Sequence, residues 1–166
     1  MIDHPESGRS FLSKGFLTEA KKLANQNIEI FKDLITSESP LIGIEPSAIL
    51  SFRDEYLRLA KHRQDASVLV KKTFLIEEFL SAEIEKGKIT SAQFSSEKKI
   101  IKIHAHCHQK AMSNVKHTFD LLNLPENFKV TIIPSGCCGM AGSFGYEKQH
   151  YEISMQIGEQ TLFPAV

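Results

Sequence analysis

The chain has 166 residues, of which 42% are hydrophobic and 24% charged, proportions that are ordinary for a globular domain. Because 20 Lys and Arg side chains balance 20 Asp and Glu side chains, no net charge favours nucleic acid or an anionic membrane as a partner. We find no apolar run of about 18 residues and no signal-peptide core, so direct membrane insertion is not expected. The 3 cysteines make a poor disulfide framework. We therefore expect a cytoplasmic protein, attached to the inner membrane only as a peripheral part of a larger complex.

The first half of the chain is predicted to be mainly helical. Apolar residues spaced 3.6 apart predict an amphipathic helix over residues 16–35. A short apolar run predicts a buried strand over 41–44. A second helix is expected from Pro46 to about residue 60, and a third over 68–87.

The second half alternates between strands and helices. Strands are predicted over 98–106 and 127–134, and helices over 110–122 and 147–162, the last with Ile153 and Ile157 facing inward. The segment 87–98 is expected to be an exposed connection. Strands separated by helices predict a layered α/β fold whose sheet is mainly parallel and flanked by helices.

The chemistry is expected in the loops that follow the two predicted strands of the second half. Cys107 follows the first strand, and Cys137 and Cys138 follow the second. Ligands of open α/β sheets bind outside the carboxyl ends of the strands, so neighbouring strands would bring the three sulfurs to one edge. Gly136 and Gly139 flank the cysteine pair and would allow close approach of the backbone, with N–H groups facing sulfide or another anion.

Several interpretations of these residues remain open from the residues alone. Cys107 could simply fill the core, as lone cysteines often do. His106 and His108 flank it and could add nitrogen ligands, although a single histidine is more often part of the scaffold. A disulfide between Cys137 and Cys138 is disfavoured, because neighbouring Cα atoms lie about 3.8 Å apart and a relaxed disulfide needs roughly 4.4–6.8 Å. The glycine-rich loop lacks the pattern of a nucleotide-binding loop.

The stretches "HCHQKA" and "PSGCCGMAGSFGYE" resemble a known family. They are similar to the cysteine-rich, CCG-type domain found in heterodisulfide reductase and in the iron–sulfur subunits of glycolate and glycerol-3-phosphate dehydrogenases. More closely, nearly the whole chain resembles the C-terminal part of FAD-linked D-2-hydroxyacid dehydrogenases that carry their own iron–sulfur modules. "LIGIEPSAILSFRDEY" and "TFLIEEFL" extend the likeness into the first half.

The resemblance implies a ligand set and a set of partners. Cys107, Cys137 and Cys138 would bind an iron–sulfur cluster or, alternatively, zinc, the latter with His106 or His108. It implies an electron-transfer module, part of an oxidoreductase of the glycolate oxidase, D-lactate or D-2-hydroxyglutarate dehydrogenase type. FAD would lie on another domain or subunit, a flavin-binding oxidase, and a ferredoxin-like iron–sulfur domain would be a second partner.

The resemblance also implies two tandem repeats, of which the first has lost its thiols. "HPESGRSFLSKG" matches "PSGCCGMAGSFG" in role, with Glu6-Ser7-Gly8 in place of Cys-Cys-Gly, and Ala48 stands where relatives often have cysteine. We expect residues 1–86 to be the back half of this degenerate repeat with a connecting helix, 87–98 a linker, and 99–166 a second repeat cut before its last cysteine. The site would then be incomplete in this chain, empty or holding adventitious zinc, and the chain alone inactive.

Two other classes of function compete with electron transfer. One is a zinc-binding structural or docking domain of the same complex, without catalysis of its own. The other is a thiol-redox enzyme, which is weaker because no Cys-x-x-Cys is present.

Overall fold

The structure is a computed structural model that describes residues 2–140 and 142–166. It divides into two compact units, residues 1–79 and 80–166, and each is described by itself. The predicted α/β class is confirmed: each unit combines helices with a two-stranded parallel sheet.

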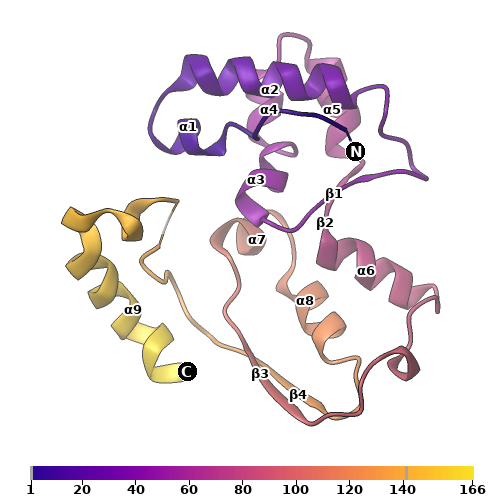
Figure 1. Ribbon diagram of the computed structural model, residues 1–166, viewed down its shortest axis with the longest axis vertical. Coiled ribbons are helices and arrows are strands. Elements are labelled where there is room, and N and C mark those ends of the chain that lie inside the picture. The colour runs from indigo at the N-terminus through magenta and orange to yellow at the C-terminus, as the bar shows by residue number, and fades with distance from the viewer. Residues whose placement is uncertain (1, 141) are drawn as a thin grey trace. The chain divides into compact units, whose positions relative to one another are not determined.

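Unit 1 consists of a small sheet and a group of packed helices (Figure 1). Its elements, in chain order, are α1 Arg9–Ser13, α2 Leu17–Phe31, β1 Leu41–Gly43, α3 Pro46–Ser51, α4 Glu55–Leu59, α5 Arg63–Val70, β2 Thr73–Leu75 and the start of α6 Ile76–Glu85. Strand β1 pairs with β2 in parallel, and α2 packs on α1, α4 and α5. Glu45 caps α3, because its carboxylate accepts the backbone N–H groups of Ser47 and Ala48.

A buried hydrogen-bond network joins the first loop of unit 1 to its helices. The Tyr56 side chain is fully buried, and its hydroxyl donates to the Ser7 carbonyl over 2.9 Å. The Asn27 amide group donates to the Tyr56 hydroxyl over 3.0 Å and to the Glu6 carbonyl over 2.9 Å. The Glu6–Ser7 segment is thus held by α2 and α4, while Gly8 turns the chain with a φ of 77°.

Unit 2 contains a second parallel strand pair, β3 and β4. Its elements are the end of α6, the 3₁₀ turn η1 Ser91–Gln93, β3 Lys99–Ile103, α7 Cys107–Met112, α8 Val115–Leu122, β4 Phe128–Ile132, the 3₁₀ turns η2 Phe144–Tyr146 and η3 Lys148–His150, and α9 Tyr151–Ala165. Ile101 lies opposite Val130 and Ile103 opposite Ile132 in the register. Helix α8 packs on β4.

The predicted helix over 68–87 is wrong in its middle. Strand β2 lies inside it, between α5 and α6. Its pairing with β1 is extended by the Leu41 amide, which donates to the Lys72 carbonyl. Tertiary pairing thus outweighs a helix-like spacing of apolar residues.

Two other predicted helices are interrupted. The helix from Pro46 to 60 breaks after Ser51, where the Arg53 amide bonds three residues back to the Leu50 carbonyl and so tightens the last turn. The helix over 110–122 is two helices, because the Asn114 side chain accepts the Lys116 amide and starts α8 anew.

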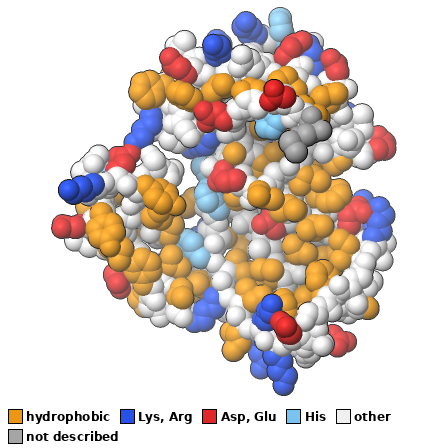
Figure 2. All heavy atoms as spheres, in the orientation of Figure 1, with side chains coloured by type: hydrophobic (Ala, Val, Ile, Leu, Met, Phe, Trp, Pro, Cys, Tyr) orange, Lys and Arg blue, Asp and Glu red, His pale blue; other side chains and the backbone are white. Residues whose placement is uncertain are grey.

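Helix α9 also differs from its prediction. It begins at Tyr151 instead of 147, after two 3₁₀ turns separated by an extended Glu147. Ile153, expected to face inward, is 50% exposed, and the buried residues of the helix are Ser154 and Gly158. Figure 2 shows hydrophobic side chains at the surface of this part of the molecule, where Tyr151 and Phe163 are also exposed.

The two units differ in how many apolar side chains they bury. Among the described residues, the buried apolar side chains of unit 2 are Ile103, Ala105, Pro125 and Ile133, whereas unit 1 buries twelve, from Ala20 to Leu75. Polar contacts also join elements of unit 2, such as the bond from the Lys102 ammonium to the Ala165 carbonyl at the end of α9.

Replacing Tyr56 by Phe tests the network of unit 1. The substitution leaves the Ser7 carbonyl without its donor and removes one of the two acceptors of the Asn27 amide, so we expect the free energy of unfolding to fall by about 1–3 kcal/mol. Urea unfolding measures it. Tyr151→Phe is the matched control: this side chain is 58% exposed, and its loss should change the stability little. Equal effects of the two substitutions would contradict the network.

The same tyrosine predicts a loss of stability in alkaline solution. Burial raises the pKa of Tyr56 above its ordinary value of 10.0, against the smaller opposite effect of the Asn27 hydrogen bond. Above that pH the unfolded chain loses this proton and the folded chain keeps it, so stability is full below pH 10 and falls as the pH rises further. Urea midpoints between about pH 9 and 11 should fall more steeply for the natural chain than for Tyr56→Phe.

Candidate functional site

The carboxyl ends of β3 and β4 lie at one edge of their sheet, as required for the predicted site. The two strands are neighbours in parallel register. Cys107 follows β3 by four residues, and Cys137 follows β4 by five. The premise of the sequence prediction, that these strands are adjacent, is therefore met.

Cys107 is the first residue of α7, and His106 caps that helix. The Nδ1 of His106 accepts the backbone N–H of His108 over 3.1 Å, and the two imidazole rings stack with centroids 5.4 Å apart. The side chain of Cys107 is exposed. In a neutral His106 ring this bond places the proton on Nε2, so the capping arrangement occupies the lone pair that would bind a metal.

Two contacts tie the start of α7 and the end of β3 to the loop after β4. The Lys110 ammonium donates to the carbonyls of Ser135 and Gly136, over 2.8 and 3.2 Å. His104 Nδ1 lies 2.5 Å from the Ser135 hydroxyl. The pKa of His104 is lowered, first by burial and then by the charges of Lys110 and His106. The segment that leads to Cys137 is thus held next to α7.

The cysteine pair lies in a loop that contains a backbone hydrogen bond to sulfur. The Gly139 N–H donates to Cys137 Sγ over 3.3 Å. Cys137 is exposed, and Cys138 is half-buried. Backbone N–H groups that point at sulfur stabilise the negative charge of a thiolate, which is the form that binds metals.

Gly139 also fixes the loop to α9. Its φ is 85°, and a Cβ on it would lie 2.3 Å from the Ser154 carbonyl oxygen. The Ser154 hydroxyl donates to the Gly139 carbonyl over 3.0 Å. No side chain fits at this position, so the glycine sets the distance between loop and helix. By contrast, a Cβ on Gly136 would meet nothing within 4 Å.

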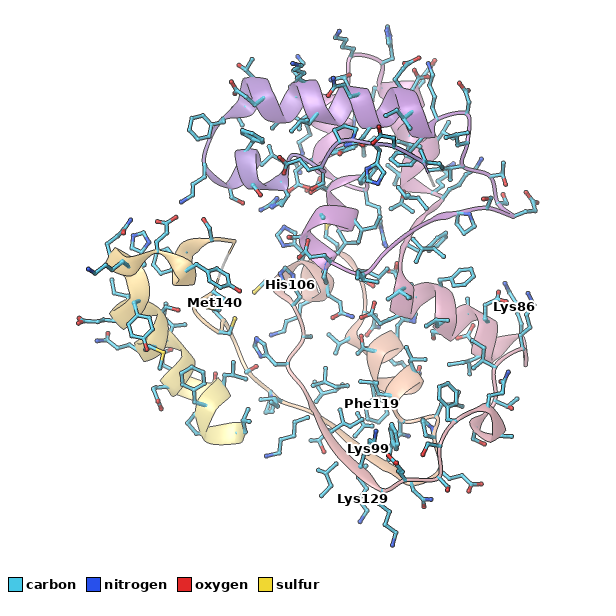
Figure 3. The ribbon with its side chains drawn as sticks, in the orientation of Figure 1. Lys86, Lys99, His106, Phe119, Lys129 and Met140 are labelled. Carbon is cyan, nitrogen blue, oxygen red and sulfur yellow. The ribbon has the colours of Figure 1, made fainter. Side chains whose placement is uncertain are left out.

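The structure does not gather the candidate ligands into a closed site. Within residues 2–140 and 142–166, no group of three His, Cys, Asp or Glu side chains lies close enough to hold a metal ion. Figure 3 shows His106 at the start of α7 and Met140 in the loop before α9. The donor chemistry fits a thiolate-bound group, because three cysteines follow one sheet edge and one already accepts an N–H bond.

Sequence reasoning missed the polar residues that support this loop. Lys110, His104 and Ser135 were not among the predicted site residues, although the spacing of His104 and Lys110 around Cys107 could have suggested them. Ser154 could not have been found, because in the sequence it is a polar residue between two apolar ones on a predicted helix.

The comparisons with known proteins link the chain to dehydrogenases. It is 27% identical over 152 residues to a subunit of the anaerobic glycerol-3-phosphate dehydrogenase of Escherichia coli K12, covering 91% of this chain and 37% of that protein. It is 28% identical over 159 residues to the D-2-hydroxyglutarate dehydrogenase of Haemophilus influenzae, covering 95% and 15%. The enzyme of that name from Escherichia coli K12 is 27% identical over 168 residues, covering 100% and 16%.

These matches show distant homology over most of the chain, which is thereby related to components of dehydrogenases. The chain spans between 15% and 37% of the length of these curated relatives. No family model matches the chain. No solved structure matches it either. None of the described helices is both long enough and apolar enough to cross a membrane.

Replacing Gly139 by Ala tests the attachment of the loop to α9. A methyl group there meets the Ser154 backbone and requires a positive φ, so we expect the unfolding free energy of unit 2 to fall by at least about 2 kcal/mol. Urea unfolding followed by NMR of the α9 amides measures it.

Two matched controls separate the causes of this effect. Gly87→Ala requires a positive φ but meets no neighbour, and Gly136→Ala requires neither. The expected order of destabilisation is Gly139, then Gly87, then Gly136. A Gly139 variant no less stable than the Gly87 variant would contradict the close packing against α9.

Proposed function

We propose that the chain is an iron–sulfur electron-transfer module of a flavin-linked dehydrogenase that oxidises a 2-hydroxyacid or a related alcohol. The observation that carries the proposal is the placement of Cys107, Cys137 and Cys138 after the carboxyl ends of two paired parallel strands. The N–H bond from Gly139 to Cys137 Sγ supports it, since such bonds tune thiolate-bound clusters.

The names of the relatives support a role that is independent of the substrate. One is a subunit of a glycerol-3-phosphate dehydrogenase, and others are D-2-hydroxyglutarate dehydrogenases. A phosphorylated polyol and a hydroxydicarboxylate have little in common except a secondary alcohol that loses two electrons. A segment shared by both kinds of enzyme is therefore better suited to receiving electrons than to recognising a substrate.

The three cysteines would hold the group, with Gly136 and Gly139 allowing the backbone to approach it. A cluster bound there would supply one-electron transfer, and because four cysteines are the usual set, a fourth ligand would have to come from elsewhere. The residues of this chain would set the electrostatic environment of the cluster. Gly139 N–H donates to sulfur, and the Lys110 ammonium, held at the Gly136 carbonyl, adds a positive charge that favours the reduced state.

Zinc is the alternative occupant, in a structural or docking domain without catalysis. Cys₃His is a common zinc set. His106 suits it poorly, because its Nδ1 already accepts the His108 N–H. His108 is the better candidate for the fourth ligand.

The partners, cellular location and repeat organisation of the chain belong to the same proposal. FAD would lie on another domain or subunit that oxidises the substrate, and a ferredoxin-like iron–sulfur domain would exchange electrons with this module. The chain would work in the cytoplasm, where thiols stay reduced, and would catalyse nothing alone. We also propose that 1–86 is the back half of a degenerate first repeat with a connecting helix, that 87–98 is a linker, and that 99–166 is most of a second repeat.

Metal analysis of the anaerobically prepared protein tests the proposal. After incubation with ferrous iron and sulfide, we expect bound iron, acid-labile sulfide and a broad visible absorption. Replacing Cys107, Cys137 or Cys138 by Ser should remove most of the absorption, because each replacement removes a thiolate ligand. His62→Ala, on an exposed residue outside the site, is the control and should leave it unchanged.

Other results would favour the zinc alternative or exclude both metals. One zinc per chain without sulfide, reduced by His108→Ala, would favour the zinc alternative. Anaerobically prepared protein that stays colourless and binds neither metal would rule out both occupants.

A further inference from the structure

Unit 1 contains a groove that the proposed electron transfer does not use. It lies between α2 and the turn that leads from α4 into α5, and its volume is about 580 Å³. In Figure 1, α2 runs alongside α4 and α5, on which it packs. The lining includes a lysine cluster, which consists of Lys21, Lys22 and Lys61. The volume falls within the range of small-molecule sites, roughly 300–1,000 Å³.

The side chain of Asn25 fixes the backbone on both sides of the groove. Its amide group donates to the Lys21 carbonyl over 2.7 Å and to the Leu59 carbonyl over 3.0 Å. Its oxygen accepts the backbone N–H of Lys61 over 2.8 Å. The turn that carries Lys61 is therefore tied to the helical turn that carries Lys21. A site whose frame is already in place loses little entropy when a ligand binds.

The lysine cluster has no counter-charge in the part of the chain that the structure describes. Its three side chains are exposed and take part in none of the ion pairs of the described residues. The two carboxylates of the lining, Glu29 and Asp65, lie instead 2.8 and 3.8 Å from the Lys32 ammonium. Because unpaired like charges repel one another, an anion bound among the three lysines would stabilise the folded chain.

The donors of the groove suit phosphate better than carboxylate. Among the described residues that line it there is no arginine, whose planar fork is the usual partner of a carboxylate. A lysine ammonium is a compact charge with three donors, which can meet the oxygens of a tetrahedral anion from different directions. Thr18 and Gln26 also line the groove, and neither side chain has a hydrogen-bond partner within the described chain, so both can donate to the same anion.

The charge and size of the groove favour more than one phosphate group. A single phosphate group carries about −1.5 to −2 at neutral pH, so it would leave part of the charge of the lysine cluster unbalanced. Two or three linked phosphates would balance all three lysines. The volume of about 580 Å³ has room for such a chain and for a further group attached to it.

We propose that this groove binds a small polyanion that carries two or more linked phosphate groups, with Lys21, Lys22 and Lys61 as its cationic partners. The site is distinct from the cysteines, and it does not depend on the proposed electron transfer. Its affinity comes mainly from charge, so it should weaken as the ionic strength rises.

Titration of the 166-residue chain with inorganic tripolyphosphate, followed by calorimetry and amide NMR, tests the proposal. We expect saturable binding that weakens severalfold between about 50 and 200 mM salt, with amide shifts on residues 18–29 and 59–65. Inorganic phosphate should bind at least about tenfold more weakly, because it leaves lysine charge unbalanced. The absence of saturable binding, shifts confined to other segments, or equally tight binding of phosphate or of an octaglutamate peptide would overturn the proposal.

Two lysine variants locate the site. Lys61→Gln removes one charge of the cluster and should weaken tripolyphosphate binding at least about fivefold. Lys71→Gln is the matched control: it removes the same charge from an exposed residue at the opposite end of α5, outside the lining, and should bind within about twofold of the natural chain. Both should keep the circular dichroism of the natural chain. Equal losses in the two variants would mean that only the net charge matters, and would refute the assignment.

Discussion

A glycine in the left-handed region that contacts a later helix of its own unit is a constraint that both units share. In unit 2, a Cβ on Gly139 would lie 2.3 Å from the Ser154 carbonyl oxygen. In unit 1, a Cβ on Gly8 would lie 3.4 Å from the backbone of Ala20 in α2. At Gly139 the approach leaves no room for a side chain on the loop, whereas at Gly8 a Cβ would be in ordinary van der Waals contact and the positive φ is what favours glycine.

The residues that precede each of these glycines are held in place by different contacts in the two units. The residues before Gly139 are held at the end of β4, where the Gly139 N–H meets Cys137 Sγ and Lys110 holds the preceding carbonyls. The residues before Gly8 are held instead by Tyr56 and Asn27, through the carbonyls of Glu6 and Ser7. The same turn therefore follows two cysteines in unit 2 and adjoins a buried hydrogen-bond network in unit 1.

The sequence predicted the α/β class and the approximate position of most elements, because long amphipathic patterns such as that of α2 report burial directly. It failed at β2, where pairing with β1 decides the structure and the local pattern does not. It also placed Ile153 inward on α9, where Ile157 is half-buried but the buried residues are Ser154 and Gly158, and Ser154 packs against Gly139 in the preceding loop.

The candidate site was predictable only in part, for a similar reason. The positions of Cys107, Cys137 and Cys138 after their strands follow from element order, and the adjacency of β3 and β4 fits that order. Loop conformation decides whether sulfur atoms converge, and it depends on contacts such as Lys110 with Gly136 that no local pattern encodes.

The glycine contact also has a consequence for how such a protein can change over generations. The approach of Gly139 to α9 is made by backbone atoms of Ser154 and by the absence of a side chain on the glycine, not by the side chains of Cys137 or Cys138. In unit 1 the same two positions hold Glu6 and Ser7, and the glycine that follows them also has a positive φ. A loop of this kind can thus differ in its reactive residues between the two units while both keep the glycine turn.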